Sequence, residues 1–253
     1  MNKKKIYIVT GGFSGIGLSI CGNLLHNNHQ VVSIGKTPKK LLNLKKKFKK
    51  YKKNFDPIIC NLENESEIKD LKKYLNKKYV KIDGLVNNAG INPSRNNILK
   101  TSLNDWNKTL NVNLTGVFLL TKYVLPNLKN NSSIVNISSV AAKGMKNRIS
   151  YSTSKAGLIG FTKSLAIDFA KRKIRVNCLL PGYVKTNLVK NYLRNLSVNE
   201  KKELVEKHAL NQLGEPQDIS EIVNFLLSEK SKWITGSIIN IDGGYLLNTQ
   251  KLR

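Results

Sequence analysis

Short apolar runs rich in isoleucine and valine alternate along the chain with longer segments whose apolar residues recur at helical spacing. The short runs predict about seven strands, at 6–9, 31–34, 57–60, 84–87, 133–138, 175–179 and 237–241. The longer segments predict helices at 15–28, 38–53, 65–78, 104–128, 151–171 and 217–228. Strands that alternate with helices in this way favour an α/β fold, in which helices cover both faces of a parallel sheet.

The pattern contains no repeat, linker or low-complexity boundary, so we expect a single doubly wound domain over residues 1–253. The segment 185–213 interrupts the alternation with a helical pattern rich in lysine and glutamate. Its position after a strand end predicts a helical lid over a site. A solvated pair of helices fits the composition equally well.

The apolar runs and the cysteines indicate the compartment of the protein. No apolar run approaches the roughly 20 residues that a membrane-spanning helix needs, and the apolar stretch 6–9 is too short for the core of a signal peptide. The cysteines Cys21, Cys60 and Cys178 are odd in number and far apart, which favours neither disulfides nor a zinc site. We therefore expect a cytoplasmic protein with no metal and no membrane partner.

The charge is the most unusual feature of the composition, since 43 Lys and Arg against 16 Asp and Glu give a formal net charge of +27. Such an excess can bind nucleic acid or anionic membranes. Lysine accounts for 37 of the basic residues, however, and asparagine, which shares A/T-rich codons with lysine, is also abundant. We attribute most of the charge to biased genome composition and expect no specific nucleic-acid partner. The densest run, ten lysines within 36–53, is typical of the solvated face of an amphipathic helix.

The first expected strand is followed by the turn Thr10-Gly11-Gly12-Phe13-Ser14-Gly15-Ile16-Gly17 and then by a helix. Glycines at a strand-to-helix turn allow backbone N–H groups and the positive helix end to bind a pyrophosphate. The spacing is TGxxxGxG and not the GxGxxG of the usual dinucleotide fingerprint. Taken alone, the turn is also compatible with a tight turn that binds no ligand.

Tyr151 and Lys155 stand one helical turn apart in the sequence Tyr-Ser-Thr-Ser-Lys. A neighbouring cation favours the phenolate and lowers the tyrosine pKa from about 10, as a general acid or base near neutral pH requires. Such pairs also occur by chance on surface helices, so this pair needs support from the rest of the chain. The expected strand 133–138 supplies support, because it leads into Ser138 and Ser139 at the kind of strand end where open α/β sheets bind ligands.

Six motifs together resemble the classical short-chain dehydrogenase/reductases. They are TGxxxGxG, Asn87-Asn88-Ala89-Gly90, Asn113 within 112–116, the Ser138-Ser139 pair, Tyr151-x-x-x-Lys155 and Pro181-Gly182. The resemblance extends from Lys5 to about Leu247 and is most like the 3-oxoacyl-[acyl-carrier-protein] reductase branch in 181–186, 213–218 and 242–244. It implies a Rossmann-like sheet and an NAD(P)(H)-dependent oxidoreductase that interconverts a carbonyl and a secondary alcohol by hydride transfer.

The resemblance also implies roles for individual residues. Tyr151 would be the general acid or base, Lys155 would lower its pKa and hold the nicotinamide ribose, and a serine would polarise the substrate oxygen. We favour Ser139 for that serine because the strand fixes its register, although Ser138 restores the thirteen-residue spacing to Tyr151 of many relatives. Asn113 would hold a water that links Lys155 to solvent, and a kink residue inside a helix is the alternative for it.

The adenine end of the cofactor site is specified by the strand 31–34, which leads into Gly35-Lys36 with no carboxylate for the ribose 2′-hydroxyl of NAD. We therefore predict that NADP(H) is preferred, with Lys36 on the 2′-phosphate, and that NAD(H) is possible. Asn61 stands where the family usually has Asp, and its amide oxygen would contact adenine. The other implied cofactor contacts are Tyr151, Lys155, Thr10, Gly11, Gly12, Ser14, Gly15, Ile16, Gly17, Leu62, Asn88, Ala89, Gly90, Pro181, Gly182, Val184 and Thr186.

The branch implies a substrate carried by acyl-carrier protein in fatty-acid synthesis, and Arg172 and Lys129 match its carrier-binding basic positions. A dehydrogenase or reductase of a free sugar, polyol or secondary alcohol is the alternative. A non-catalytic dinucleotide-binding or polyanion-binding protein is a remote one. The resemblance further implies a homotetramer in which 104–128 and 151–171 form one interface.

Overall fold

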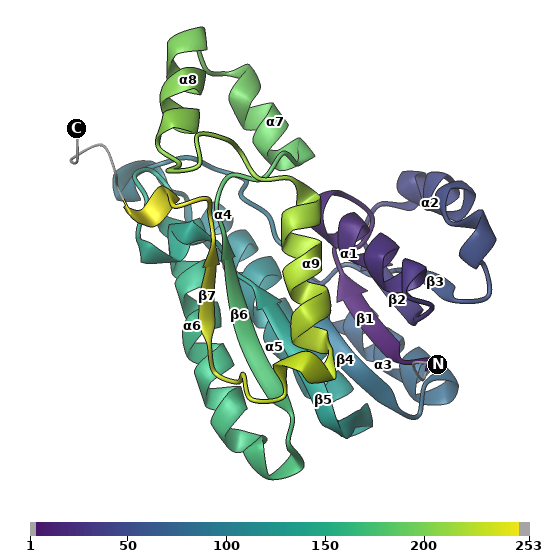
Figure 1. Cartoon of the computed structure of the whole chain (residues 1–253). Helices are drawn as coiled ribbons and strands as arrows, with labels where there is room; N and C mark the ends of the chain where they lie inside the picture. Colours follow the sequence, from purple (N-terminus) through teal and green to yellow (C-terminus); the bar gives the residue numbers. More distant parts are fainter. Residues whose placement is uncertain (1–3, 248–253) are drawn as a thin grey trace.

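Seven parallel strands form one sheet in the order β3-β2-β1-β4-β5-β6-β7 in the computed structural model, which describes residues 4–247 (Figure 1). The strands are β1 (Ile6–Thr10), β2 (Gln30–Gly35), β3 (Phe55–Ile59), β4 (Ile82–Asn87), β5 (Leu128–Ile137), β6 (Arg175–Pro181) and β7 (Ile238–Ile241). The predicted α/β, Rossmann-like fold is confirmed. The strand order reverses between β1 and β4, and a reversal of this kind opens a crevice at the carboxyl ends of the strands.

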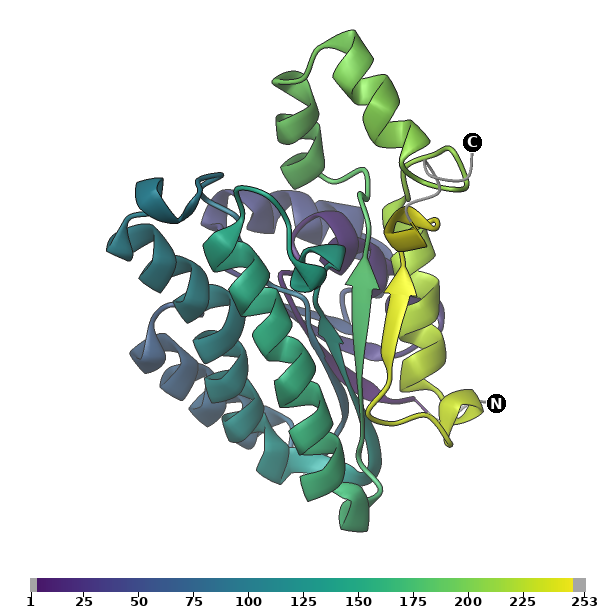
Figure 2. The same cartoon turned by 90° about the vertical axis from the view of Figure 1, so that its left-hand side faces the viewer.

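Helices cover both faces of the sheet, as Figures 1 and 2 show. They are α1 (Gly15–His26), α2 (Leu41–Lys47), α3 (Glu65–Lys78), α4 (Leu103–Leu110), α5 (Gly116–Val124), α6 (Ile149–Asp168), α7 (Asn187–Arg194), α8 (Val198–Glu206) and α9 (Pro216–Leu227). One core joins the sheet to α1, α2 and α9, and a second joins the other face to α3, α5 and α6. This double burial explains why the strands are continuous apolar runs.

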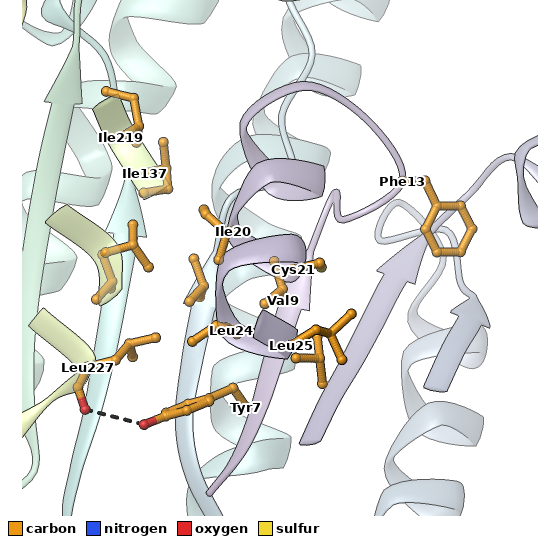
Figure 3. Close-up of a cluster of buried hydrophobic side chains, with 14 of the residues drawn as sticks. Tyr7, Val9, Phe13, Ile20, Cys21, Leu24, Leu25, Ile137, Ile219 and Leu227 are labelled. Atoms are coloured by element: carbon orange, nitrogen blue, oxygen red, sulfur yellow. Dashed lines mark hydrogen bonds between the residues drawn. The ribbon is translucent and has the colours of Figure 1, made fainter. Parts of the chain in front are cut away.

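The core under α1 is built around β1 (Figure 3). Tyr7 is 2% exposed, and its hydroxyl donates a hydrogen bond of 3.5 Å to the backbone carbonyl of Leu227 at the end of α9. Val9 and Ile20 are buried in the same cluster. This packing fixes α1 against the sheet and thereby fixes the glycine turn that precedes it.

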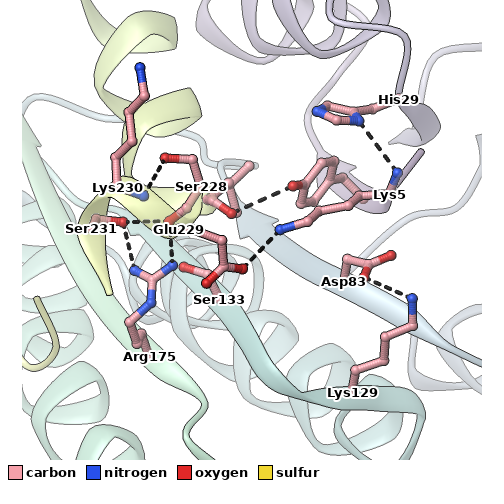
Figure 4. A network of polar contacts seen from close by, with 12 residues as sticks. Lys5, His29, Asp83, Lys129, Ser133, Arg175, Ser228, Glu229, Lys230 and Ser231 are labelled. Carbon is pink, nitrogen blue, oxygen red and sulfur yellow. Dashed lines mark hydrogen bonds and ion pairs between the residues drawn. The ribbon is translucent and has the colours of Figure 1, made fainter. Parts of the chain in front are cut away.

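Polar contacts connect the amino ends of the strands, at the opposite end of the sheet from the crevice (Figure 4). Lys5 pairs with Glu229 at 3.0 Å, and Lys129 pairs with Asp83 at 2.8 Å. Arg172, just beyond α6, donates to the backbone carbonyls of residues 125 and 128. Lys129 and Arg172 therefore have partners within the chain.

The predicted helix 104–128 is wrong in its continuity. It is divided into α4 and α5 by a π-helical turn, Asn111–Thr115, and β5 begins at Leu128. The predicted helix 38–53 is a short α2 flanked by 3-10 turns, and the helix predicted at 151–171 is α6, followed by a 3-10 turn at Ala170–Arg172. The segment 185–213 forms α7 and α8, which project from the carboxyl end of the sheet (Figure 1). Residues 1–3 and 248–253 of the expected single domain lie outside the described residues.

Within residues 4–247, no helix has the length and apolar character needed to cross a membrane. Cys21, Cys60 and Cys178 are all free and buried. These residues serve as small apolar side chains in the core.

Candidate active site

A groove runs along the carboxyl ends of the strands across the point where the strand order reverses. One part is a cavity of about 270 Å³, and a second cavity of about 190 Å³ adjoins it through the shared residues Gly11, Ser14, Ala89 and Gly90. The larger cavity is lined by most of the residues that the sequence predicts for the site: Gly11, Ser14, Gly15, Ile16, Asn88, Ala89, Gly90, Ser139, Tyr151, Lys155, Pro181, Gly182, Val184 and Thr186. Lys36, Asn61 and Leu62 line the smaller one.

The glycine turn between β1 and α1 forms the floor that joins the two cavities. Gly11 and Gly15 have backbone φ angles of +64° and +53°, which residues other than glycine rarely adopt. Ser14 is the N-cap of α1 but makes no side-chain cap hydrogen bond, so the first N–H groups of the helix are not capped by it. A narrow glycine floor that ends in free helix N–H groups fits the pyrophosphate of a dinucleotide.

Three predicted cofactor residues lie behind the groove wall and line neither cavity. The Thr10 hydroxyl accepts hydrogen bonds of 2.9 Å from the N–H groups of Asn88 and Ala89, which fixes the loop after β4 beside the turn. A Cβ on Gly12 would lie 2.3 Å from the Ser33 hydroxyl oxygen. A Cβ on Gly17 would lie 2.3 Å from the backbone carbonyl oxygen of Gly11 in the same turn. These residues shape the floor from below.

The smaller cavity has the composition expected for the adenine end of the cofactor. Lys36 lines it, with its Nζ atom 3.7 Å from the Glu63 Oε1 atom. The Asn61 amide oxygen accepts a hydrogen bond of 3.3 Å from the backbone N–H of Glu63, which leaves that oxygen one further lone pair. Lys40 also lines the cavity, and sequence reasoning missed it because it lies within a long lysine run.

Lys155 lies in the second turn of α6 and is almost completely buried, with 3% of its surface exposed. Its ammonium donates a hydrogen bond of 2.8 Å to the backbone carbonyl of Ile137 and lies 5.8 Å from the centroid of the Tyr151 ring. Burial lowers the pKa of Lys155 to about 8, because a charged group is less stable away from water. The predicted Tyr–Lys pair therefore exists, with its cation held by the end of β5.

The pKa of Tyr151 is not controlled as the sequence predicted. Burial raises it, while hydrogen bonding with the Ser139 hydroxyl and the positive charge of Arg148 lower it. The expected cation was Lys155, but Lys155 directs its ammonium to Ile137 in this structure. Ser139 and Arg148 are therefore the groups that favour the phenolate.

The two candidate serines have different surroundings. The Ser138 hydroxyl donates a hydrogen bond of 2.7 Å to the backbone carbonyl of Lys155, so its only proton is used. The Ser139 hydroxyl accepts a hydrogen bond of 3.1 Å from the backbone N–H of Ala141 and acts on Tyr151. This arrangement favours Ser139 as the serine that faces a bound substrate.

Asn113 lies in the π-helical turn between α4 and α5 and is fully buried. Its amide nitrogen donates to the backbone carbonyl of Ile91 at 2.9 Å and to the Ser154 hydroxyl at 3.0 Å, and its amide oxygen accepts from the Ile91 N–H at 2.8 Å. Asn113 is thus the kink residue that the sequence left as an alternative. One lone pair of its oxygen remains for the predicted water, and such π-helical turns are frequent at functional sites.

Sequence reasoning missed the outer wall of the larger cavity. Arg95, Arg148, Tyr183 and Tyr192 line it, and they come from the loop after β4, the start of α6, the segment after β6 and α7. The only available signal was composition, since arginine supplies just six of the 43 basic residues. A phenol, a hydroxyl and an ammonium that meet in one cavity can bind a carbonyl oxygen and exchange a proton with it.

Comparisons with known proteins agree with this geometry. The profile of a family described as enoyl-(acyl carrier protein) reductase matches residues 11–246. The 3-oxoacyl-[acyl-carrier-protein] reductase of Thermotoga maritima is 34% identical over 247 residues, which cover 96% of this chain and 98% of that protein. The corresponding reductase of Buchnera aphidicola subsp. Schizaphis graminum is 38% identical over 245 residues, with 96% and 97% covered. The structure of ElxO with NADP bound superposes with a TM-score of 0.88 at 31% identity, covering 96% of this chain and 99% of that one.

Proposed function

Since this chain belongs to the short-chain dehydrogenase/reductase family and is an NAD(P)-dependent oxidoreductase, we propose that it reduces the ketone of a 3-oxoacyl thioester borne by acyl-carrier protein. The observation that carries this proposal is the meeting of Tyr151, Ser139 and Lys155 in the cavity beside the glycine floor. The two reductases at 34% and 38% identity are named for this reaction and are matched over nearly their whole length. The activity would belong to fatty-acid synthesis.

The residues of the cavity divide the chemistry. NADPH, when bound, would supply the hydride that adds to the carbonyl carbon. Tyr151 donates its phenolic proton to the carbonyl oxygen, and Ser139 donates a hydrogen bond that stabilises the charge growing there. Ser139 and the charge of Arg148 stabilise the phenolate left on Tyr151. Lys155 would pass one proton to that phenolate and regain one from a water held by Asn113, so that one proton is taken up in all.

We propose NADP(H) as the preferred cofactor and NAD(H) as a weaker one. Lys36 and Lys40 both line the cavity at the adenine end, where a 2′-phosphate adds negative charge that two ammonium groups can bind. ElxO, at 31% identity, has NADP bound in its solved structure. The glycine floor fits the pyrophosphate of either cofactor.

The experiment measures the reduction of acetoacetyl-acyl-carrier protein through the accompanying oxidation of NADPH. Tyr151→Phe should lower kcat/KM by about 10²- to 10⁴-fold, the usual contribution of general acid catalysis, and should leave NADPH affinity unchanged. Tyr123→Phe, on the outer helix α5, is the matched control and should keep wild-type activity. Wild-type turnover by Tyr151→Phe would refute the assigned role.

A free small carbonyl compound is the second candidate substrate. It is favoured by the outer wall of the cavity, where Arg95, Arg148 and Tyr192 supply polar groups. Lys129 and Arg172 give the carrier-protein proposal no support, because each is bound within the chain at the far end of α6 from Tyr151. Turnover of acetoacetyl thioesters against a panel of sugars, polyols and secondary alcohols distinguishes the two candidates.

A homotetramer and a cytoplasmic location complete the proposal. The outer faces of α5 and α6 expose Phe118 and Ile167, with 46% and 77% of their surfaces accessible, and these helices are the expected interface. Light scattering should give the mass of four chains, and Ile167→Glu should reduce it. A wild-type mass equal to one chain would reject the tetramer.

A further inference from the structure

Two arginines lie in the outer wall of the larger cavity, and neither exchanges a proton in the proposed reaction. Arg148 precedes the first residue of α6 and is buried, with 7% of its surface exposed. Arg95 comes from the loop that follows β4. Their guanidinium carbons lie 5.5 Å and 3.4 Å, respectively, from the centroid of the Tyr192 ring on α7. Three separate segments thus bring two positive charges to one aromatic ring.

No acidic side chain among the described residues neutralises the charges of this arginine pair. None of the side chains that line the cavity is acidic, and neither arginine forms an ion pair with any of the residues 4–247. Asn92, with its amide oxygen turned toward Arg148, accepts one hydrogen bond of 2.8 Å from it. A guanidinium has five N–H donors, so most donors of the pair remain for a ligand.

Holding two like charges together in a partly buried wall is unfavourable unless an anion binds between them. The pKa of Arg95 reflects this unfavourable interaction. It is lowered chiefly by burial and, to a smaller extent, by the positive charge of Arg148. Planar guanidinium groups match the two oxygens of a carboxylate, which they bind through paired hydrogen bonds. The arrangement therefore has the form of an oxyanion-binding wall.

The position of the pair relative to Tyr151 restricts the ligand. Arg148 and Tyr151 line the same cavity, and the charge of Arg148 lowers the pKa of Tyr151. An anion bound there lies near the reacting carbonyl. The phosphate of a carrier-protein arm is separated from a 3-oxo group by the whole length of the arm, so it does not match this position.

We propose that Arg95 and Arg148 form an oxyanion subsite of the substrate cavity, and that the substrate is a carbonyl compound with a carboxylate a few bonds from its ketone. The proposal rests on the carbonyl reductase activity proposed above and specifies its substrate class. The carboxylate belongs either to a free keto acid or to the far end of a 3-oxoacyl thioester. Both present the same chemistry to the two arginines.

The test compares acids with their uncharged counterparts in NADPH-dependent reduction by the full chain. The free pair is 4-oxopentanoate and its methyl ester, and the thioester pair is 3-oxoadipyl- and 3-oxohexanoyl-N-acetylcysteamine. In both acids two methylene groups separate the ketone from the carboxylate. Wild type should favour one or both acids in kcat/KM by about 10- to 100-fold, the value of one or two charge-assisted hydrogen bonds, and the pair that shows the larger preference identifies the source of the carboxylate.

Arginine variants separate this role from a structural one. Arg95→Gln should lower kcat/KM for the acids by about tenfold or more and leave the uncharged partners nearly unaffected. Arg148→Gln should lower the ratio of kcat/KM for each acid to that for its uncharged partner by about tenfold or more, in addition to a loss common to both substrates that comes from its action on Tyr151. Arg194→Gln, exposed at the end of α7, is the matched control and should preserve the acid preference. If wild type reduces acid and ester equally well, or the variants impair both equally, the arginines only hold α7 through Tyr192 and the proposal is wrong.

Binding measurements keep this result apart from failure of the proposed activity. If no carbonyl compound is reduced, the reductase proposal fails, and the subsite is then tested by calorimetric titration of 4-oxopentanoate, and of 3-oxoadipyl-N-acetylcysteamine, into the NADP⁺-loaded protein. Saturable binding that Arg148→Gln abolishes and Arg194→Gln retains would support the subsite. If neither 4-oxopentanoate nor 3-oxoadipyl-N-acetylcysteamine binds to wild type, the subsite is rejected.

Discussion

The Ser138 hydroxyl donates a hydrogen bond of 2.7 Å to the backbone carbonyl of Lys155, and this bond ties the end of β5 to the second turn of α6. Ser139, the next residue, acts instead on the hydroxyl of Tyr151. Neighbouring residues of an extended segment point to opposite sides. Two serines that look equivalent in the sequence are thereby given separate tasks, one in joining the elements that carry the site and one in the site itself.

Substitution of each serine should separate these tasks. Ser139→Ala should lower kcat/KM by about 10²- to 10³-fold, as loss of one donor to a developing oxyanion does elsewhere. It should also cost about 1 kcal/mol of stability, because the hydroxyl caps the turn after β5 through the Ala141 N–H. Ser138→Ala should lower the free energy of unfolding by about 1 kcal/mol and reduce kcat/KM less than Ser139→Ala does. Steady-state kinetics and urea unfolding of both variants check the prediction, and the reverse assignment of effects would show that Ser138 is the catalytic serine.

Lys155 should be required for reductase activity but should lower the free energy of unfolding of the protein. Its pKa is lowered by burial to about 8 from the ordinary value of 10.5, so folding disfavours the charged form. One pKa unit corresponds to about 1.4 kcal/mol, which gives a cost of about 3 kcal/mol below pH 8. Lys155→Met should therefore be more stable than wild type at pH 7, by up to this amount, and should have lost its reductase activity.

The pH dependence of this difference follows from proton binding. Between pH 8 and 10.5 the unfolded chain holds a proton on Lys155 that the folded chain has released, so wild-type stability gains with rising pH. The advantage of Lys155→Met should shrink across this interval and vanish above it. Lys163→Met, an exposed position on the same helix, should differ little from wild type at any pH. A constant difference across the interval would contradict the buried charge.

The inner strands were predictable because they are buried on both faces, which selects continuous Ile and Val runs, whereas the edge strands β3 and β7 are only partly buried. β5 is the exception: its first residues, Leu128 to Ser132, include the exposed pair Asn130 and Asn131, and the apolar run begins later. The break between α4 and α5 was not predictable as a break, because it depends on bonds from Asn113 to Ile91 and Ser154, which are distant in sequence. Local periodicity contains no information on such partners.

The site was predictable where motifs fix backbone geometry and unpredictable where side chains from separate loops meet. Gly11 and Gly15 were identified from the glycine turn together with the five other motifs, and their positive φ angles explain why this turn requires glycine. Arg95 and Arg148 were counted in the sequence only as part of the net positive charge, although both lie beside the Tyr192 ring of α7. The expectation that Lys155 controls the pKa of Tyr151 was wrong because the sequence does not show the Ile137 carbonyl that accepts from its ammonium.

Cofactor preference should respond to both charges at the adenine end. Lys36 lies 3.7 Å from Glu63, so the carboxylate competes with a 2′-phosphate for the ammonium. Lys36→Ala should lower the ratio of kcat/KM for NADPH to that for NADH by about 10- to 100-fold, the value of a hydrogen bond between charged groups. Glu63→Gln should raise the same ratio, because it frees Lys36 and removes a repulsive charge.

Lys46→Ala is the matched control for these variants. It lies in the same lysine-rich stretch, is exposed and lines neither cavity of the groove, so it should leave the ratio unchanged. Initial rates with both cofactors over a range of salt concentration give the measurement. An unchanged ratio in Lys36→Ala, or a wild-type preference for NADH, would show that this lysine does not bind a 2′-phosphate.

Two glycines of α1 should respond in opposite ways to alanine. A Cβ on Gly17 would lie 2.3 Å from the carbonyl oxygen of Gly11 and 2.5 Å from the Asn88 amide nitrogen, so Gly17→Ala must push the glycine floor away from α1. We expect a loss of about 1–3 kcal/mol in stability and loss of NADPH affinity. A Cβ on Gly22 would make an ordinary contact of 3.8 Å with the Phe48 ring, so Gly22→Ala should stabilise the helix by about 0.5–1 kcal/mol.

Thermal unfolding with and without NADPH measures both effects of these alanine substitutions. A ligand that binds only the folded state raises Tm by an amount that increases with the logarithm of its affinity, so NADPH should raise the Tm of Gly22→Ala as much as that of wild type and should raise that of Gly17→Ala less. The comparison uses one helix and one type of substitution, which removes helix propensity as an explanation. A normal NADPH-induced rise in Gly17→Ala would mean that the floor tolerates displacement, and the fit of the pyrophosphate to this turn would then be wrong.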